Sequence, residues 1–456
     1  MSFSDLGSQN NSFVIKPSSL PNGSFDQSVL PLLESQIPMT TTALSTATGR
    51  ADLLNHNRIR VLWVACATHA LHDGFTDTLY LLLPIWQAEF ALGYAAIGIL
   101  RALYAGAMAG LQVPAAKLAQ RFGGAGMLAA GTAGAAVAYL FLGASSSVGV
   151  LGAALIVGGI GSSTQHPIAS NLVATAYEGP RSRGALGTYN FAGDLGKMAL
   201  PSITACLIAV MSWRSAASMV GMIGLAGAVV IGLLLRQMPL ASSNRTSVPD
   251  ADSKACEHAN KSRGGFGLLL AIGILDSATR MGFLTFLPFL LQGKGAAVPE
   301  IGIGLTLLFG GGAAGKLVCG FLGARLGMLP AVLITEGATA AGILSLLPLP
   351  LGGALVLLPI IGVALNGTSS VLYGTVPDLV PPERRPHAFG VFYTGTVGAG
   401  ALSPALYGLF GDAVGISAAM LLVAGVVLLT LPLAWQLRRV LSAVGSGFDS
   451  LGVRNR

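Results

Sequence analysis

The stretches Ala116-Lys117-Leu118-Ala119-Gln120-Arg121-Phe122-Gly123 and Gly320-Phe321-Leu322-Gly323-Ala324-Arg325-Leu326-Gly327 lie 204 residues apart, and each ends in Arg-x-Gly. The same shift superposes Leu83-Pro84 on Leu287-Pro288. Matched prolines and repeated basic turns are stronger evidence than matches in Ala, Gly or Leu, which abound in this chain. We therefore predict an internal duplication. Hydrophobic duplications of this kind are typical of membrane transporters, with the binding site between the halves.

Composition agrees with a membrane protein. The chain is 53% hydrophobic and 10% charged, with a mean hydropathy of +0.70, whereas soluble domains are about 25% charged. Apolar runs of about 20 residues are long enough to cross a bilayer. Twelve such runs lie near 59–87, 94–116, 125–143, 150–176, 184–210, 213–235, 265–291, 299–321, 329–349, 352–376, 388–410 and 415–437. The predicted fold class is an all-α polytopic membrane protein with 12 transmembrane helices in two six-helix pseudo-symmetric bundles.

The spans divide the chain into five parts. Residues 58–235 form the N-terminal bundle and residues 265–438 the C-terminal bundle. Residues 1–57 are rich in Ser, Thr, Asn and Pro without sustained periodicity, so we expect a disordered tail and no signal peptide. Residues 236–264 form a polar linker, and residues 439–456 form a C-terminal tail.

Lysine and arginine placement predicts the orientation, because basic loops stay on the cytoplasmic side. Of 26 basic residues, Arg214 and Lys294 fall in loops on one side, and most of the others fall on the opposite side. Four lie inside predicted spans: Arg101, Lys197, Arg280 and Lys316. We expect both termini and the linker in the cytoplasm. The net charge of +7 then reflects topology and predicts no nucleic-acid partner.

The two basic stretches resemble the G-x-L-x-D-R-x-G loop of the major facilitator superfamily, in corresponding places of each half. In that family the loop Asp and Arg help to latch the cytoplasmic side of the outward-facing state. Here Gln120 and Ala324 replace the Asp, while Arg121 and Arg325 remain as the expected gating residues. The resemblance covers about residues 58–440 and implies two bundles that rock about a central cavity.

A narrower resemblance lies in three spans. His69-Ala-Leu-His72-Asp73, Gly161-Ser162-Ser163-Thr164-Gln165-His166-Pro167 and Gly193-Asp194-Leu195-Gly196 are similar to elements of the fosmidomycin resistance group of that superfamily. The resemblance implies export of small, polar, phosphonate-like compounds in exchange for protons. The third element departs from the usual G-P ending, because Lys197 intrudes and Leu200-Pro201 closes it. This departure leaves the identity of the substrate undetermined.

Ionisable residues inside spans are the candidates for proton coupling, because a charge in the bilayer normally faces a cavity or a partner. His69, Asp73 and Asp77 are spaced i, i+4, i+8 on one helical face, with His72 on its shoulder. His166 and Asp194 lie at a depth similar to that of His69. We expect Asp73 to carry the proton; the alternative is a static ion pair. For the histidines, hydrogen bonding between helices is the alternative, and nothing in their spacing demands a metal.

Basic and polar residues inside spans are the candidates for substrate binding. Arg280 can grip a phosphonate or carboxylate with two parallel hydrogen bonds, and Lys197 would act as a point charge. The alternative is neutralisation within one helix, by Asp276 for Arg280 and by Asp194 for Lys197. Arg101 is expected to pair with Asp77. We expect Tyr189, Asn190 and Asn366 to line the same cavity, and Lys316 to snorkel to the interface.

The sequence thus predicts a proton-coupled antiporter in a bacterial cytoplasmic membrane that exports a small polar or anionic compound. One alternative function is proton symport for uptake of an organic anion, which would use the same residues. The alternative from another functional class is a transporter-like membrane sensor. The chain has no H-E-x-x-H and no nucleotide-binding loop, so we predict neither an enzyme nor an ATP-driven pump. No cofactor or metal is expected. The expected partners are a small-molecule substrate, protons and the lipid bilayer, and the expected state is a monomer.

Overall fold

A computed structural model describes residues 41–177, 180–236, 259–381 and 384–449. The chain divides into two compact units, residues 1–55 and 56–456, and the second holds both bundles. Residues 1–40 of the predicted tail lie outside the described part, as do most of the linker and the last residues of the chain. The predicted tail nevertheless contains the start of a helix, because the first described helix begins at Thr41.

The N-terminal half contains seven described helices that form six spans. They are α2 (Thr41–Phe90), α3 (Tyr94–Phe122), α4 (Gly124–Gly143), α5 (Val148–Ser162), α6 (Gln165–Ala176), α7 (Pro180–Ile208) and α8 (Trp213–Arg236). Helices α5 and α6 together make one span that breaks at Ser163 and Thr164. Pro167 explains the break, because its ring clashes with the carbonyl four residues earlier and its nitrogen donates no hydrogen bond.

The C-terminal half repeats this plan with seven described helices. They are α9 (Ala259–Gly293), α10 (Val298–Leu326), α11 (Met328–Leu346), α12 (Leu351–Leu379), α13 (Arg385–Val414), α14 (Ile416–Leu428) and α15 (Thr430–Asp449). Helices α14 and α15 form one span. The six-plus-six organisation predicted from the repeat is therefore confirmed.

Ten segments of the described chain are long and apolar enough to cross a membrane. The other two spans, α2 and α13, carry polar side chains that face the centre of the protein. On the outside, large apolar side chains are exposed, among them Val356 (75%), Ile360 (62%) and Val229 (61%). Such a surface is suited to lipid, which has no polar groups to offer in its hydrocarbon core.

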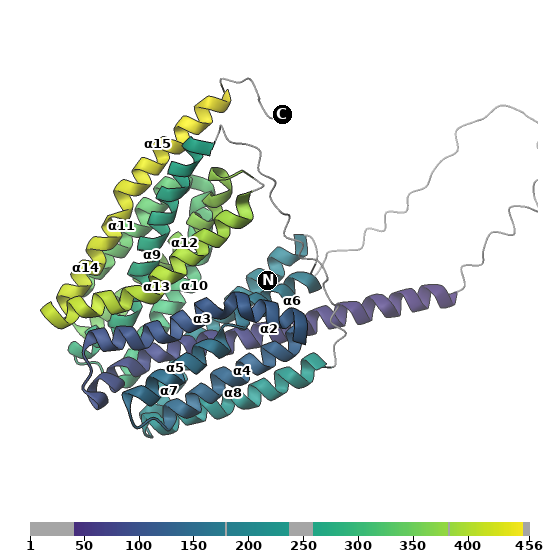
Figure 1. Cartoon of the computed structure of the whole chain (residues 1–456), viewed down its shortest axis with the longest axis horizontal. Coiled ribbons are helices and arrows are strands. Elements are labelled where there is room, and N and C mark those ends of the chain that lie inside the picture. Colours follow the sequence, from purple (N-terminus) through teal and green to yellow (C-terminus); the bar gives the residue numbers. More distant parts are fainter. Residues whose placement is uncertain (1–40, 178–179, 237–258, 382–383, 450–456) are drawn as a thin grey trace, which may run out of the picture. The chain divides into compact units, whose positions relative to one another are not determined.

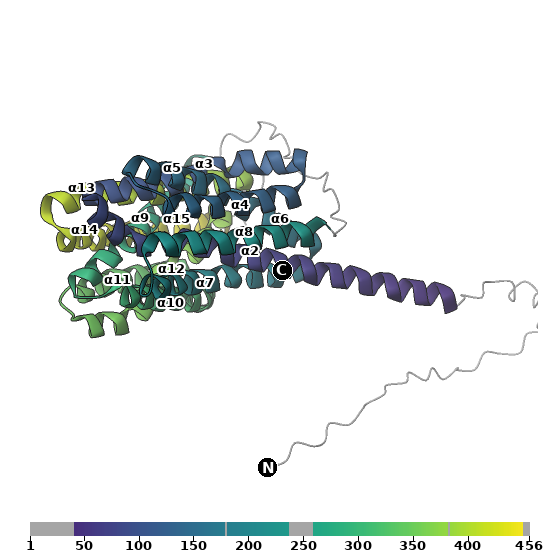
Figure 2. The same cartoon turned by 90° about the horizontal axis from the view of Figure 1, so that it is seen from below.

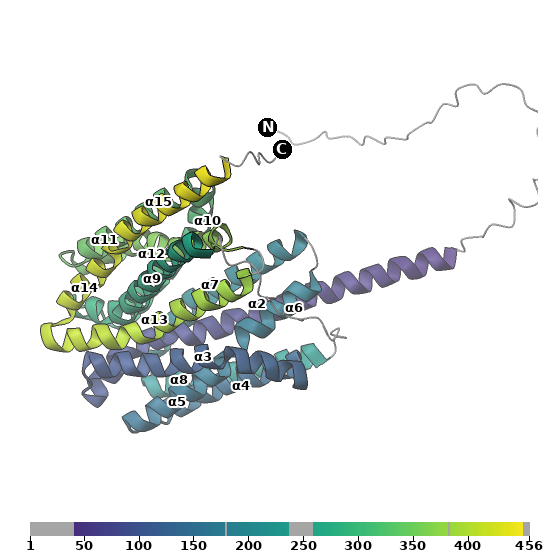
Figure 3. The ribbon, with the colours of Figure 1, turned by 45° about the horizontal axis from the view of Figure 1, so that its top comes forward.

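The two bundles meet at one end and separate at the other. Helix α3 lies beside α13 (Figure 1), and the contacts between helices place α7 beside α10. The ribbons converge where α3 begins and α13 ends, and they diverge towards α6 and the end of α15 (Figure 3). We call the diverging end the basic end, because the loop residues Arg121 and Arg325 lie there. The converging end is called the far end.

The apolar core follows the same division. The largest buried cluster draws residues from both bundles near the far end, such as Leu83 and Phe286. A second cluster, with Val64 and Leu128, belongs to the N-terminal bundle alone, and a third, with Ile272 and Leu372, to the C-terminal bundle alone. Seen from below, the long helices of both halves run roughly parallel (Figure 2). The bundles are thus joined by packing at the far end and are packed separately at the basic end.

Close backbone contact seals the far end. A Cβ atom on Gly98 of α3 would overlap the Pro404 carbonyl of α13, so only glycine fits there. The Asp412 carboxylate of α13 accepts hydrogen bonds from the Tyr94 and Ala95 N–H groups at the start of α3, at 2.6 and 3.0 Å. An acidic side chain is favourable at a helix N-terminus, because the first N–H groups have no partner within the helix.

Candidate functional site

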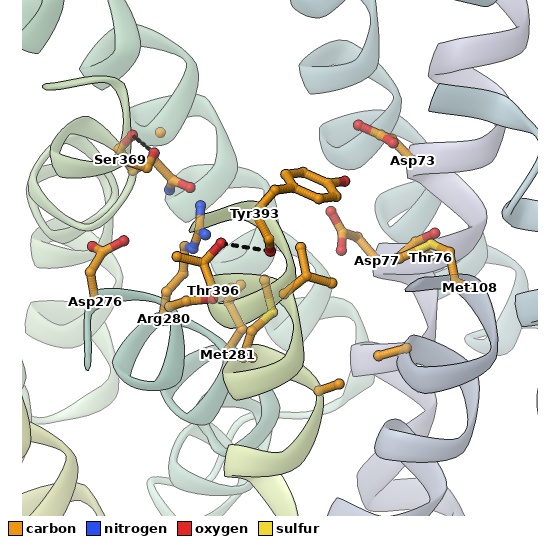
Figure 4. Close-up of a pocket in the computed structure, with 18 of the residues that line it drawn as sticks. Asp73, Thr76, Asp77, Met108, Asp276, Arg280, Met281, Ser369, Tyr393 and Thr396 are labelled. Atoms are coloured by element: carbon orange, nitrogen blue, oxygen red, sulfur yellow. Dashed lines mark hydrogen bonds between the residues drawn. The ribbon is translucent and has the colours of Figure 1, made fainter. Parts of the chain in front are cut away.

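A cavity of about 280 Å³ lies between the bundles. Asp73 and Asp77 of α2 lie on one side, and Asp276 and Arg280 of α9 lie on the other (Figure 4). Eight of the residues singled out in the sequence line it: Asp73, Asp77, Arg101, His166, Asp194, Lys197, Arg280 and Asn366. Side chains scattered over both halves of the sequence thus come together at the centre of the protein.

Four other predicted residues lie away from the cavity lining. His69 and His72 are buried behind it, and the His72 Nε2 atom is 2.9 Å from the Thr132 hydroxyl. Tyr189 is buried and stacks on His69, whereas Asn190 is exposed on α7. The placement of Tyr189 and Asn190 therefore differs from the cavity lining expected for them. Helix phase explains the difference, because neighbouring positions on α7 face different surroundings.

Asp73 is the centre of a polar cluster. Its Oδ2 atom lies 3.3 Å from the His69 Nε2 atom and 3.3 Å from the Lys197 Nζ atom, and its Oδ1 atom lies 4.0 Å from the His166 Nε2 atom. His69 and Asp73 are neighbours because they are one helical turn apart on α2. Lys197 reaches Asp73 because α7 packs tightly on α2: a Cβ atom on Gly193 would lie 2.7 Å from the Asp73 Oδ2 atom.

The hydrogen bond behind His69 fixes its protonation pattern. The His69 Nδ1 atom is 2.8 Å from the Tyr189 carbonyl oxygen. A carbonyl can only accept, so Nδ1 carries the hydrogen. In neutral His69 the Nε2 atom would then present a lone pair to the Asp73 carboxylate, at 3.3 Å. A proton on Nε2 or on Asp73 would turn this contact into a hydrogen bond.

A second carboxylate connects the two bundles. The Lys316 Nζ atom of α10 donates to both oxygens of Asp194 on α7, at 2.6 and 2.7 Å. Lys197 lies 3.5 Å from the same carboxylate. Asp73, Lys197, Asp194 and Lys316 thus form a continuous chain of alternating charges. The expected snorkelling of Lys316 does not occur, because the partner on the opposite bundle is closer.

Arg101 lies at the far-end side of the cavity with tyrosines around it. Its Nη2 atom donates to the Tyr80 hydroxyl at 3.0 Å, and its guanidinium lies 4.7 Å from the centre of the Tyr80 ring. Within the described part of the chain, no ion pair joins Arg101 to Asp77. The structure thus differs from the predicted pair. Both residues instead line the cavity.

His69, Asp73 and His166 also offer donor atoms that lie within 4.8 Å of one another, a spacing that a metal ion could use. The Lys197 ammonium, 3.3 Å from Asp73, already neutralises the carboxylate. A second cation at this point would be repelled by Lys197.

The expected gating residues end their helices at the basic end. Arg121 and Arg325 are exposed in the last turns of α3 and α10. Each lies over a neighbouring aromatic ring, Arg121 at 5.5 Å from the centre of Phe122 and Arg325 at 4.2 Å from that of Phe321. Within the described part of the chain, no ion pair joins either arginine to the opposite bundle.

One buried acid was not singled out in the sequence. Glu336 of α11 is 2% exposed. A single Glu in the apolar run around it is a signal, because charged residues in spans are rare.

Two bundles of six spans around a charged central cavity define a secondary transporter. The chain belongs to the major facilitator superfamily, which it matches over residues 65–272 and 269–448. Proteins of this superfamily move small-molecule substrates across membranes and are not enzymes.

The chain is similar to the uncharacterized MFS-type transporter Rv1250 of Mycobacterium tuberculosis, with 24% identity over 199 residues. The match covers 44% of this chain and 34% of that relative. In structure the chain resembles a bacterial homolog of the human lysosomal transporter Spinster, described as inward-facing and unoccupied, with a TM-score of 0.69. The sequence identity is 18%, and the match covers 85% of this chain and 98% of that homolog. It also resembles a point mutant of the nucleoside transporter NupG, with a TM-score of 0.66 and 14% identity over 84% of this chain and 99% of that one. These likenesses show the fold.

Proposed function

We propose that the protein is a proton-coupled antiporter that exports a small polar or anionic compound by alternating access. The observation that carries the proposal is the His69–Asp73 contact, which a proton would turn into a hydrogen bond because the Tyr189 carbonyl keeps the hydrogen of neutral His69 on Nδ1. This proton-binding pair adjoins the central cavity through Asp73. Coupling of proton movement to substrate movement requires at least a proton site beside the substrate cavity.

The charge chain supplies a mechanism. Asp73 holds Lys197, and Asp194 holds both Lys197 and Lys316. When a proton neutralises Asp73, Lys197 loses one of its two carboxylate partners and turns to Asp194. It then competes there with Lys316, which belongs to the other bundle. Protonation of Asp73 therefore weakens a bond between the bundles and shifts the balance between cavity states.

Arg280 is the proposed contact for an anionic substrate. It lines the cavity opposite Asp73, and its Nε atom is buried without a hydrogen-bond partner within the described part of the chain. A phosphonate or carboxylate would satisfy that donor and form charge-assisted hydrogen bonds. The resemblance of the His166-Pro167 element to the fosmidomycin resistance group supports a substrate of this chemistry.

The proposed location is a bacterial cytoplasmic membrane, with both termini in the cytoplasm. The bias of Lys and Arg towards one side supports this orientation. The basic end would then face the cytoplasm, and the described state would be the one that admits substrate from inside. Arg121 and Arg325 would act as gates by contacting the opposite bundle when that end closes.

Proton movement in everted vesicles tests the proposal, with a pH-gradient dye and with fosmidomycin among the added compounds. We expect a compound to dissipate the gradient with the wild type and with neither Asp73→Asn nor Arg280→Ala. Wild-type behaviour of Asp73→Asn would contradict the proton assignment. Uptake of a compound together with protons would replace antiport by symport.

A further inference from the structure

Arg101 of α3 is a buried cation at the wall of the central cavity. The residue is 5% exposed, and within the described part of the chain none of the ion pairs includes it. An arginine side chain keeps its positive charge inside proteins. Its Nε and Nη1 atoms are buried, and no acceptor of the described chain bonds them. Because a buried charge without a partner is unfavourable, a bound anion is the partner that this guanidinium lacks.

Two tyrosines fix the position of this guanidinium. Its Nη2 atom donates to the Tyr80 hydroxyl at 3.0 Å, and its carbon lies 4.7 Å from the centre of the Tyr80 ring and 5.4 Å from that of Tyr104. The Tyr104 hydroxyl is itself hydrogen-bonded to Ser162 at 2.7 Å and to Thr76 at 2.9 Å. A group that is already held in place loses little conformational freedom when it binds a ligand.

The phase of α3 turns Arg101 towards the cavity. Arg101, Ala105, Met108 and Gln112 all line it, with the spacing i, i+4, i+7 and i+11 of one helical face. Met108 marks this wall in the close-up of the cavity, and Arg280 lies on the opposite side (Figure 4). Arg101 is therefore part of the cavity wall formed by the N-terminal bundle.

Arg280 is the corresponding residue of the C-terminal bundle. Within the described chain, the buried arginine nitrogens without a hydrogen-bond partner all belong to Arg101 and Arg280, and both residues line the cavity. The Tyr80 hydroxyl that holds Arg101 donates to the Met281 Sδ atom at 3.4 Å, and Met281 follows Arg280 on α9. Unpaired donors thus face one cavity from both bundles.

The acids in the cavity wall limit where an anion can bind. Asp73 and Asp194 are already engaged by Lys197, at 3.3 and 3.5 Å. Asp77 and Asp276 also line the cavity and would repel a negative group. Anionic groups are therefore favoured at the two guanidinium groups, on opposite walls, and disfavoured between them.

We propose that Arg101 and Arg280 bind the two ends of a substrate that carries two anionic groups, such as a phosphonate and a carboxylate. The assignment of Arg280 rests on the function proposed above, whereas Arg101 and the second anionic group go beyond it. Tyr80 and Tyr104 are positioning residues, because they act through the guanidinium of Arg101.

Isothermal titration calorimetry on the purified full-length protein tests the site with two pairs of probes. The compound 3-phosphonopropionate is compared with ethylphosphonate, which lacks the carboxylate, and glutarate is compared with butyrate. We expect each probe with two anionic groups to bind roughly 10- to 100-fold more tightly than its partner, since the second group forms a charge-assisted hydrogen bond. Equal affinities within both pairs, or no binding of either probe with two anionic groups, would overturn the proposal in the wild type alone.

Substitution of each arginine separates binding from a merely structural role. In Arg101→Gln and in Arg280→Gln we expect the difference within each pair to disappear, because one end of the probe loses its partner. A structural role would weaken both members of a pair alike and preserve their difference. Arg438→Gln is the matched control, since Arg438 also lies over an aromatic ring, that of Trp435, but is exposed on α15 and does not line the cavity. This control should retain the wild-type difference.

Binding is measured without a proton gradient, so the two proposals can fail separately. If Asp73→Asn moves protons like the wild type while the difference within each pair depends on Arg101, proton coupling through Asp73 fails and the two-arginine site stands. If the wild type exchanges a compound for protons and the pairs bind equally, the two-arginine site fails alone.

Discussion

At the scale of single residues, the bond between Lys316 and Asp194 is the ion pair that joins the bundles within the described part of the chain. Replacing either partner leaves the other without its main counter-charge. We expect Lys316→Met to lower the free energy of unfolding by about 1–3 kcal/mol. This is less than for a fully buried pair, because the Lys316 side chain is 38% exposed. A detergent titration on Lys316→Met, Asp194→Asn and the double variant measures the coupling.

The double variant decides whether the pair interacts as the structure implies. We expect its loss of stability to be smaller than the sum of the two single losses, because one interaction is removed only once. Lys117→Met, at the basic end and outside the charge chain, should change stability by less than about 0.5 kcal/mol. Additive effects of the two single variants would show that Lys316 and Asp194 act independently.

Sequence reasoning succeeds for contacts within one helix and is weaker between helices. The i, i+4 spacing of His69 and Asp73 predicts their contact, which lies at 3.3 Å. The partner of Lys316 could not be predicted, because Asp194 lies 122 residues away and on the other bundle. Glu336 was missed because it stands alone in the apolar run of α11, and the helices packed on α11, such as α12 and α14, are identified only by the fold.

At the scale of helices, Asp412 acts as a cap that one bundle provides for the other. Loss of a capping side chain typically costs about 0.5–2 kcal/mol. Because this cap exists only while the far end is closed, Asp412→Ala should favour opening of the far end by roughly 2- to 30-fold. The labelling rate of a single cysteine introduced at Tyr94 measures this opening. Gly98 is unsuitable for the label, because a side chain there would overlap the backbone of α13.

A matched control exists for this cap. Glu300 accepts a hydrogen bond from the Ala297 N–H at 2.6 Å, within the C-terminal bundle at the same end. Glu300→Ala removes an acidic cap without removing a contact between bundles, so we expect unchanged cysteine labelling. Equal labelling in Asp412→Ala and Glu300→Ala would show that Asp412 does not hold the far end closed.

The helices themselves were largely predictable, and the reason is physical. Long apolar runs in a bilayer must form helices, because each backbone group has to find its partner within the segment. The break between α5 and α6 follows from Pro167. The start of α2 at Thr41 was not predicted, because the sequence before residue 58 lacks a sustained apolar face.

At the scale of the whole molecule, the two bundles are joined at the far end and separate at the basic end. The contacts that hold this state differ in kind. The far end is closed by apolar packing and by the Asp412 cap, whereas the Lys316–Asp194 bond joins the bundles at Asp194, which lines the cavity. A change of charge in the cavity therefore acts on the bond that is nearest to it and leaves the packing intact.

The last prediction concerns the balance between the two cavity states. Spin labels on Leu118 of α3 and His387 of α13, both exposed at the basic end, measure the separation of the bundles. Asp73→Asn mimics a protonated Asp73, so Lys197 competes for Asp194 and the bond to Lys316 weakens. We expect the shorter separation to gain population several-fold, because the described state loses a stabilising contact. Lys316→Met should produce the same shift, and the double variant no further one, since both changes act through a single bond. A further shift in the double variant, or none in Asp73→Asn, would contradict coupling through Lys197.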